Sequence, residues 1–175
     1  MGLLDQGAPE FFGEVMERTS VAHSFNLEPS DLHSELPLEV VSTGLRYLIV
    51  PVLPRVLQRA RILQNLTNLL HGLSAQFAVL FDGSTMEMRH WNNDGVIEDI
   101  ATGSAAGTVG AYLLRHGLAQ GGDEVILHRG RFVDRPSQVR VMAEGTSELV
   151  NSVKVGGDVA IVGSGRLDTL PDAGS

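Results

Sequence analysis

The sequence predicts an α/β (α+β) fold in which a mixed sheet curls around one central helix. The first observation is the segment 104–117, SAAGTVGAYLLRHG, a helical pattern that contains several glycines and alanines. Each glycine costs an exposed helix roughly 1 kcal/mol relative to alanine, so such a helix needs close backbone neighbours in compensation. The second observation is that short β-rich runs, separated by turn residues, fill most of the remaining chain. With 175 residues and 43% hydrophobic content, the chain can build one substantial core.

Before the central helix, the pattern predicts two further helices and four strands. Apolar residues recur at a loose helical spacing in residues 9–25. Residues 54–73 show the clearest amphipathic pattern in the chain, and Gly72 is the expected helix stop. The expected strands are 38–44 and 46–52, with a turn or bulge at Thr43 and Gly44, and a hairpin of 76–82 and 86–92 joined by DGST.

After the central helix, the chain alternates strands and turns. Arg115 and His116 are cations at the expected helix C-terminus, and Gly117 fits a left-handed cap. The expected strands are 124–131, 138–145, 147–157 and 158–167. The resulting organisation is a linker-like segment over residues 1–12, a domain over 13–167 and a flexible tail over 168–175.

The composition excludes several classes of partner and site. The net charge is −8 and Lys154 is the single lysine, so the clustered positive charge that nucleic acid and anionic membranes require is missing. The chain has no cysteine, which excludes disulfides, thiolate metal sites and cysteine nucleophiles. The six histidines lack ligand-like spacing, so no metal site is expected, and His90 is assigned to a strand surface. Neither a long apolar run nor a signal-peptide pattern is found, which favours a cytoplasmic protein.

Residues 97–108, IEDIATGSAAGT, contain the candidate functional site. Thr102 is expected to cap the central helix, so that the amides from Gly103 onward point at whatever lies before the helix. A helix start carries about half a positive charge and favours a carboxylate or phosphate ligand. Ser104 adds a hydroxyl, and Asp99 stands at the mouth of the same site. The alternative is structural, because a helix cap that follows acidic residues is most often only a cap.

The same stretch resembles the signature of the phenazine-biosynthesis PhzF-like family, G-x-P-E-D-P-x-T-G-S-A. Other segments agree with that family in the family's order. VVSTGLRYLIVPV resembles its S-T-G-x-x-x-L-I-V segment, MRHWNNDG its R-x-F-x-P-x-x-G approach, RFVDRPSQVRV its G-R-P-S strand entry and VKVGGDVAIVGSGRL its closing hairpin. The resemblance covers residues 5–167 and corresponds to the C-terminal half of such proteins.

The resemblance implies a diaminopimelate epimerase-like domain, a curled sheet around a central helix. Family members of known activity are isomerases or epimerase-like enzymes that move a proton without a cofactor, and they hold a small carboxylic acid between two such helix starts. By resemblance, Asp99 would hold the substrate's amino or hydroxyl group or assist proton transfer. Thr102, Gly103 and Ser104 would bind its carboxylate. Ile100 replaces the family's proline, which is expected to loosen the loop that carries Asp99.

The family's first-domain elements, its glutamate general base and its G-H-x-T helix start, have no counterpart here. Only Asp99 and Glu98 are left for acid/base work. Three arrangements stay open: a homodimer that assembles the cleft from two copies, a separately encoded first domain, or a fragment of a longer chain. Two functions also stay open, an isomerase half-site and a non-catalytic relative that binds a small acid or serves as an interaction module.

Overall fold

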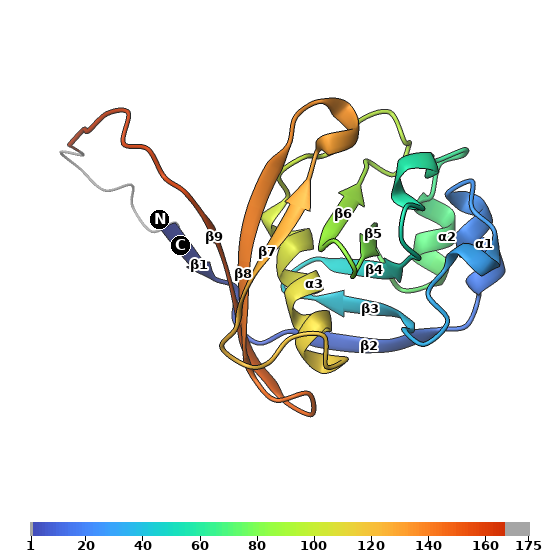
Figure 1. Ribbon diagram of the computed structural model, residues 1–175, viewed down its shortest axis with the longest axis horizontal. Helices are drawn as coiled ribbons and strands as arrows, with labels where there is room; N and C mark the ends of the chain where they lie inside the picture. The colour runs from blue at the N-terminus through green and yellow to red at the C-terminus, as the bar shows by residue number, and fades with distance from the viewer. Residues whose placement is uncertain (1, 167–175) are drawn as a thin grey trace, which may run out of the picture.

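A single curled sheet of nine strands surrounds one helix in the computed structural model, which describes residues 2–166 (Figure 1). The strand order is β1-β9-β8-β7-β6-β5-β4-β3-β2, and neighbours are antiparallel except for the parallel pairs β4–β5 and β6–β7. The predicted α/β class, with a mixed sheet around a central helix, is therefore confirmed. The strands are β1 (Gly2–Asp5), β2 (Glu10–Val15), β3 (Leu38–Ser42), β4 (Arg46–Pro51), β5 (Phe77–Asp82), β6 (Glu87–His90), β7 (Glu124–Arg129), β8 (Ser137–Gly145) and β9 (Val150–Gly157).

The central helix is α3 (Gly103–Arg115), which lies inside the curl, as the glycine-rich pattern predicts (Figure 1). Its residues from Ala105 to Leu114 are all buried. A methyl group on Gly110 would lie only 3.1 Å from Cβ of Val141 on β8, so the glycine permits a close approach of helix and sheet. Gly117, at φ 70°, provides the expected left-handed stop.

Two apolar cores lie on opposite faces of the sheet. The inner core packs α3 against inward-facing strand residues such as Ile49, Val79 and Leu127. The outer core packs α1 (Arg18–Ser24), α2 (Thr67–Gly72) and the loop before α2 against residues such as Leu48 and Leu80. Neighbouring strand residues alternate between the two cores, as the pleat requires.

The prediction of a long amphipathic helix over residues 54–73 is wrong. The structure has a 3-10 turn at Leu57–Arg59, an irregular stretch and only the short helix α2, which does end at the predicted Gly72. Arg89 explains the break, because its buried guanidinium donates to the carbonyl oxygens of Leu57 at 2.7 Å and Ala60 at 3.3 Å. These side-chain contacts replace the helical ladder, while the apolar residues of the stripe still reach the outer core.

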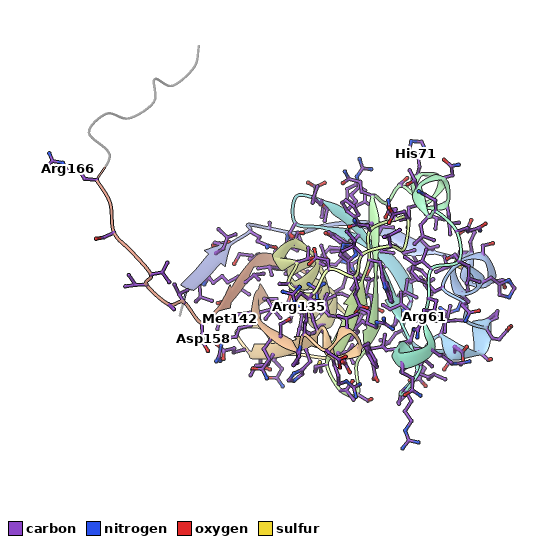
Figure 2. All side chains as sticks on the ribbon, turned by 90° about the horizontal axis from the view of Figure 1, so that it is seen from above. Arg61, His71, Arg135, Met142, Asp158 and Arg166 are labelled. Atoms are coloured by element: carbon purple, nitrogen blue, oxygen red, sulfur yellow. The ribbon has the colours of Figure 1, made fainter. Side chains whose placement is uncertain are left out.

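Two other predicted elements also differ. The first half of the helix expected over residues 9–25 is strand β2, which pairs with β3 through a register shift between Phe11 and Glu14, and only α1 is helical. No strand forms in residues 158–166, the described part of the last predicted strand. Figure 2 shows the chain from Asp158 to Arg166 running out from the body, and Val162 is 99% exposed. A β-rich run needs a neighbour to pair with, and this one has none in the described part of the chain.

The remaining expected strands are confirmed, including the hairpin of β5 and β6 and the turn between β3 and β4. Residues 2–5, inside the segment expected to be linker-like, pair with β9 at the edge of the sheet. The expected flexible tail, residues 168–175, lies outside the described residues. Among residues 2–166, no helix is long and apolar enough to cross a membrane.

Candidate active site at the start of α3

Thr102 is the N-cap of α3, as expected from the sequence. The first helical hydrogen bond runs from the Ala106 amide to the Thr102 carbonyl oxygen at 3.2 Å, so the three amides before Ala106 have no partner within the helix. The Thr102 side chain does not cap these amides. It donates its hydroxyl hydrogen bond to Asp99 instead, which leaves the helix start open.

Asp99 lies in the tight turn that leads into α3. Its Oδ1 accepts a hydrogen bond from the Ala101 amide at 3.0 Å, and its Oδ2 accepts one from the Thr102 hydroxyl. Partial burial alone would raise the pKa of this carboxyl, but the two hydrogen bonds and the nearby Arg129 charge outweigh burial and lower it. Asp99 is therefore a stable carboxylate at neutral pH.

Ser104 is joined to the inner face of the sheet by Tyr47 on β4. The two hydroxyl oxygens lie 3.0 Å apart, and the Tyr47 side chain is buried. Burial raises the pKa of Tyr47, so the phenol stays protonated and can donate to Ser104. When Tyr47 donates, the hydroxyl hydrogen of Ser104 is left for a ligand.

His90 is buried on the inner face, so its assignment to a strand surface is wrong. Its backbone oxygen accepts the Asp99 amide at 2.9 Å, which places the two residues opposite each other on adjacent segments. Its Nδ1 lies 2.9 Å from the Ala78 carbonyl oxygen and must carry the proton there, because a carbonyl only accepts. Burial lowers the pKa of His90, so the ring is neutral near pH 7.

Arg129, the last residue of β7, is the third inward-facing polar residue at this end of the curl. It is 1% exposed and donates to the Thr102 carbonyl oxygen at 3.0 Å and to the Asp99 carbonyl oxygen. Its Nε is buried and has no hydrogen-bond partner among residues 2–166. Burial lowers the pKa of Arg129 and Asp99 raises it, but an arginine remains charged at neutral pH.

The turn around Ile100 is held although the family's proline is missing. The Ser137 hydroxyl donates to the Ile100 carbonyl oxygen at 2.5 Å, and Arg129 holds the carbonyls of Asp99 and Thr102. Three hydrogen bonds from β7 and β8 therefore constrain the loop that the sequence suggested would be loose.

Glu98 takes no part in the site. Its carboxylate faces the outer side of the sheet and accepts two hydrogen bonds from Arg89, at 3.0 Å and 2.5 Å. Both side chains are 4% exposed, so the pair is a closed structural contact. Asp99 is thus the only one of the two motif carboxylates that faces the helix start.

An open groove of about 760 Å³ adjoins the site. Arg129 and Ser137, which hold the Asp99 turn, are shared with this groove. The other lining residues are mostly polar and come from the neighbouring strands and loops: Thr85, Glu87, His128, Arg131, Pro136, Gln138 and Asp158. Glu87 and His128 are the strand neighbours of the inward-facing Met88 and Leu127, so the groove opens mainly on the outer side of the sheet, and none of the four motif residues lines it.

The structure brings together the four sequence-predicted residues and three that the sequence analysis missed: Tyr47, His90 and Arg129. A period-two pattern could have found them, because Ile49, Met88 and Leu127 lie two residues away on the same inner face. At three positions where this face should be apolar, the chain places polar side chains. All three lie at the strand ends nearest the start of α3.

Comparison with known proteins identifies the class to which this fold and site belong. The phenazine biosynthesis-like protein (PhzC-PhzF) family matches residues 2–165, and the chain belongs to this family. The solved structure of a predicted epimerase from Pseudomonas aeruginosa shares 42% sequence identity with a TM-score of 0.83, and the match covers 96% of this chain and 58% of that one. The PhzF-family phenazine biosynthesis protein of Bacillus anthracis shares 25% identity with a TM-score of 0.71, covering 87% and 56%.

Among curated relatives, the trans-2,3-dihydro-3-hydroxyanthranilate isomerase of P. aeruginosa is 39% identical over 84 residues, which is 45% of this chain and 30% of that enzyme. An uncharacterised isomerase of Bacillus subtilis is 27% identical over 150 residues, which is 79% of this chain and 50% of the relative. The chain thus spans at most about three fifths of these relatives. The epimerase-like fold expected from the resemblance is confirmed by the two solved structures.

Proposed function

We propose that this chain is the C-terminal half of a PhzF-like isomerase and supplies one of two half-sites for cofactor-independent proton transfer on a small carboxylic acid. The observation that carries the proposal is the open start of α3, where a stable carboxylate, Asp99, lies beside unsatisfied amides and the Ser104 hydroxyl. The relatives named as isomerases support the reaction class.

Each polar group of the half-site has its own role in binding or proton transfer. The amides of Gly103 and Ser104, with the Ser104 hydroxyl, bind the substrate carboxylate, since a helix start favours an anion. Asp99 accepts from the substrate's amino or hydroxyl group. When a proton leaves the carbon next to the carboxylate, negative charge moves onto the carboxylate oxygens, and the fixed donors stabilise that charge. Thr102 keeps the Asp99 carboxylate oriented.

A second half-site completes the cleft, and we propose that it comes from a second copy of this chain or from a separately encoded first domain. The chain covers 58% of the solved P. aeruginosa relative, so that relative contains a large part without counterpart here. Leu3 and Leu4 on β1 are 50% and 66% exposed, and Ile161 beyond β9 is 91% exposed. Exposed apolar residues on the edge strand β1 and on the chain that follows β9 favour association with another protein surface.

The alternative is a non-catalytic relative that binds a small acid or serves as an interaction module. It is favoured by one observation. Glu98 is closed off by Arg89, and His90 lies buried beneath the site, so the half-site offers only Asp99 as an acid/base group that faces the opening.

Two measurements test the proposal together. Light scattering gives the solution mass, and deuterium uptake from D2O into trans-2,3-dihydro-3-hydroxyanthranilate, the compound in the relative's name, reports proton transfer. We expect a dimer with uptake, and uptake lost in Asp99→Asn but kept in Asp94→Asn, an exposed acidic residue on the same connection.

If the chain is a monomer without uptake but gains uptake when a first domain of a relative is added, the separately encoded partner is supported over the homodimer. Binding of the acid without uptake in either state supports the non-catalytic alternative. No binding of the acid at all overturns the isomerase and the acid-binding relative, and leaves the interaction module.

A further inference from the structure

The guanidinium of Arg129 is the feature of the α3 site that the family motif does not account for. It is the only buried arginine of residues 2–166 with an unpartnered nitrogen, Nε, and it sits where α3 begins. We propose that Arg129 is a positioning and specificity-determining residue: it holds the Asp99–Thr102 turn in place and provides the positive charge by which the site selects an anionic acid over a neutral analogue. The proposal rests on the proposed function, in which the site binds a small carboxylic acid.

The positioning role follows from the two carbonyl contacts. Arg129 binds the carbonyl oxygens at both ends of the turn, those of Asp99 and Thr102. The Thr102 carbonyl also accepts the first helical hydrogen bond of α3, from Ala106. One side chain on β7 therefore fixes both the carboxylate and the helix start, which a ligand must contact at the same time.

The specificity role follows from the charges around the site. Asp99 and Arg129 carry opposite charges and cancel each other, His90 is neutral, and the Glu98–Arg89 pair is closed on the other face. What remains is the partial positive charge of the helix start, which attracts an acid. Without the Arg129 charge, Asp99 would leave the site net negative and repel a carboxylate ligand.

A purely structural arginine would have its donors satisfied. Arg89 is such a case, with its Nε, Nη1 and Nη2 all bonded to oxygen atoms of the protein. Arg129 keeps an uncompensated Nε in the interior, which is costly for a buried polar atom. We attribute that cost to the function of the site.

The test is a pair of ligands of similar shape, one with a charged carboxylate and the other with a neutral carboxamide in its place. The probes are 3-hydroxyanthranilate, the aromatic counterpart of the acid in the relative's name, and its carboxamide, with binding measured by calorimetry. Arg129→Gln is expected to weaken binding of the acid by about tenfold or more, because a charge-assisted interaction is lost. The affinity for the carboxamide should change by less than about threefold. Arg140→Gln is the matched control. It removes an arginine of β8 that forms a partly exposed ion pair with Glu124 of β7.

Arg129→Lys separates the two roles and guards against a folding failure of the glutamine variant. Lysine keeps the charge but cannot span two carbonyls, so preference for the acid should remain while the amides of Ala101 and Ala106 exchange hydrogen faster. Faster amide hydrogen exchange that is confined to this turn in Arg129→Lys supports the positioning role. Exchange that rises equally throughout the protein overturns that role.

The outcomes distinguish this proposal from the one on which it rests. If the unaltered chain binds neither probe, the proposed carboxylic-acid function fails, and the exchange of the turn amides still decides the positioning role. If the acid binds and Arg129→Gln leaves its preference over the carboxamide unchanged, the specificity role is overturned while the proposed function stands.

Discussion

Glu98 and Asp99 are neighbours in the sequence, but they lie on opposite faces of the sheet and meet different arginines. On the outer face, Arg89 closes on Glu98 and lies over the rings of Trp91 and Phe132, at 4.3 and 4.6 Å from their centroids. On the inner face, Arg129 binds the backbone around Asp99 and leaves the carboxylate at the mouth of the helix start. In the Arg89–Glu98 pair the two side chains satisfy each other. Arg129 and Asp99 make no such side-chain contact, and the Asp99 carboxylate stays open to a ligand.

The difference teaches that a carboxylate in a family motif is not by itself a candidate for chemistry. Its accessibility depends on whether the arginine nearby binds its side chain or its backbone. Arg89 takes up the oxygens of Glu98, whereas Arg129 orients Asp99 without neutralising it through direct contact. Substitutions on the outer face should therefore change stability, and substitutions on the inner face should change ligand binding and proton transfer.

Arg89→Met should have the largest effect on stability. It leaves the Glu98 carboxylate buried without its partner and removes one of the donors to the carbonyls of Leu57 and Ala60, so we expect a loss of about 3–5 kcal/mol in the free energy of unfolding. Urea unfolding followed by circular dichroism measures it. The double variant Arg89→Met/Glu98→Leu should recover part of the loss, and a double variant as unstable as the single one would contradict a closed ion pair.

Glu98→Gln and Asp99→Asn should have opposite consequences. Glu98→Gln breaks the buried pair with Arg89 and should cost about 3 kcal/mol of stability while leaving deuterium uptake by the folded protein intact. Asp99→Asn keeps the acceptor for the Ala101 amide and should cost within about 1 kcal/mol while abolishing uptake. Equal stability losses in the two variants would show that the faces do not differ.

His90→Gln should change how stability depends on pH. Burial holds the folded-state pKa of His90 below its ordinary value of 6.5, so between the two pKa values the unfolded chain binds more protons. The stabilisation from the neutral ring is fully present above about pH 6.5 and declines as the pH falls through that window. The rings of Tyr47 and Phe77 pack against the His90 ring, the charges of Asp99 and Arg129 lie near it on the inner face, and the Glu98 charge acts on it from the outer face.

We expect His90→Gln to lower stability by about 1 kcal/mol at pH 7.5, through the lost contact with Ala78, and to flatten the decline toward pH 5. Thermal unfolding across this range is the measurement, with the exposed His23→Gln as control. An unchanged decline in the His90 variant would mean that other groups cause it.

Tyr47→Phe should have the smallest effect. It removes the phenol oxygen that lies 3.0 Å from Ser104 but keeps the ring packed on Phe77, so we expect a loss of about 0.5–1 kcal/mol. Acid binding by calorimetry should weaken a few-fold. Tyr112→Phe, which removes a hydroxyl bonded to the Pro37 carbonyl oxygen at the far end of α3, should cost similar stability without changing binding.

Much of the fold could be predicted because the signals were local. The glycines of α3 indicated close packing, and β-rich runs bounded by turn residues indicated β3 to β9. The helix expected over 54–73 failed because a distant side chain, Arg89, takes the carbonyls of Leu57 and Ala60, and periodicity does not contain that information. The strand expected over 158–167 failed because its pairing partner is not in the described part of the chain.

The site was predictable only where it followed the motif. Asp99, Thr102, Gly103 and Ser104 are contiguous, and the structure places them together at the start of α3. Tyr47, His90 and Arg129 come from three separate strands, and they meet there only because the sheet curls. Their shared inner face could be read from strand periodicity, but which strand ends converge is set by the strand order.

The edge strands of the sheet, β1 and β2, are consecutive in the sequence, so the chain itself joins the two edges. Gln6, in the connection, donates to the Gly103 carbonyl oxygen at 3.2 Å and accepts from the Thr43 hydroxyl at 2.7 Å. Because β1 pairs only with residues 154–157, it cannot dock until nearly all of the chain that follows it is present. The contact between Gln6 and the start of α3 therefore forms late in folding, and the site is among the last parts of the molecule to be assembled.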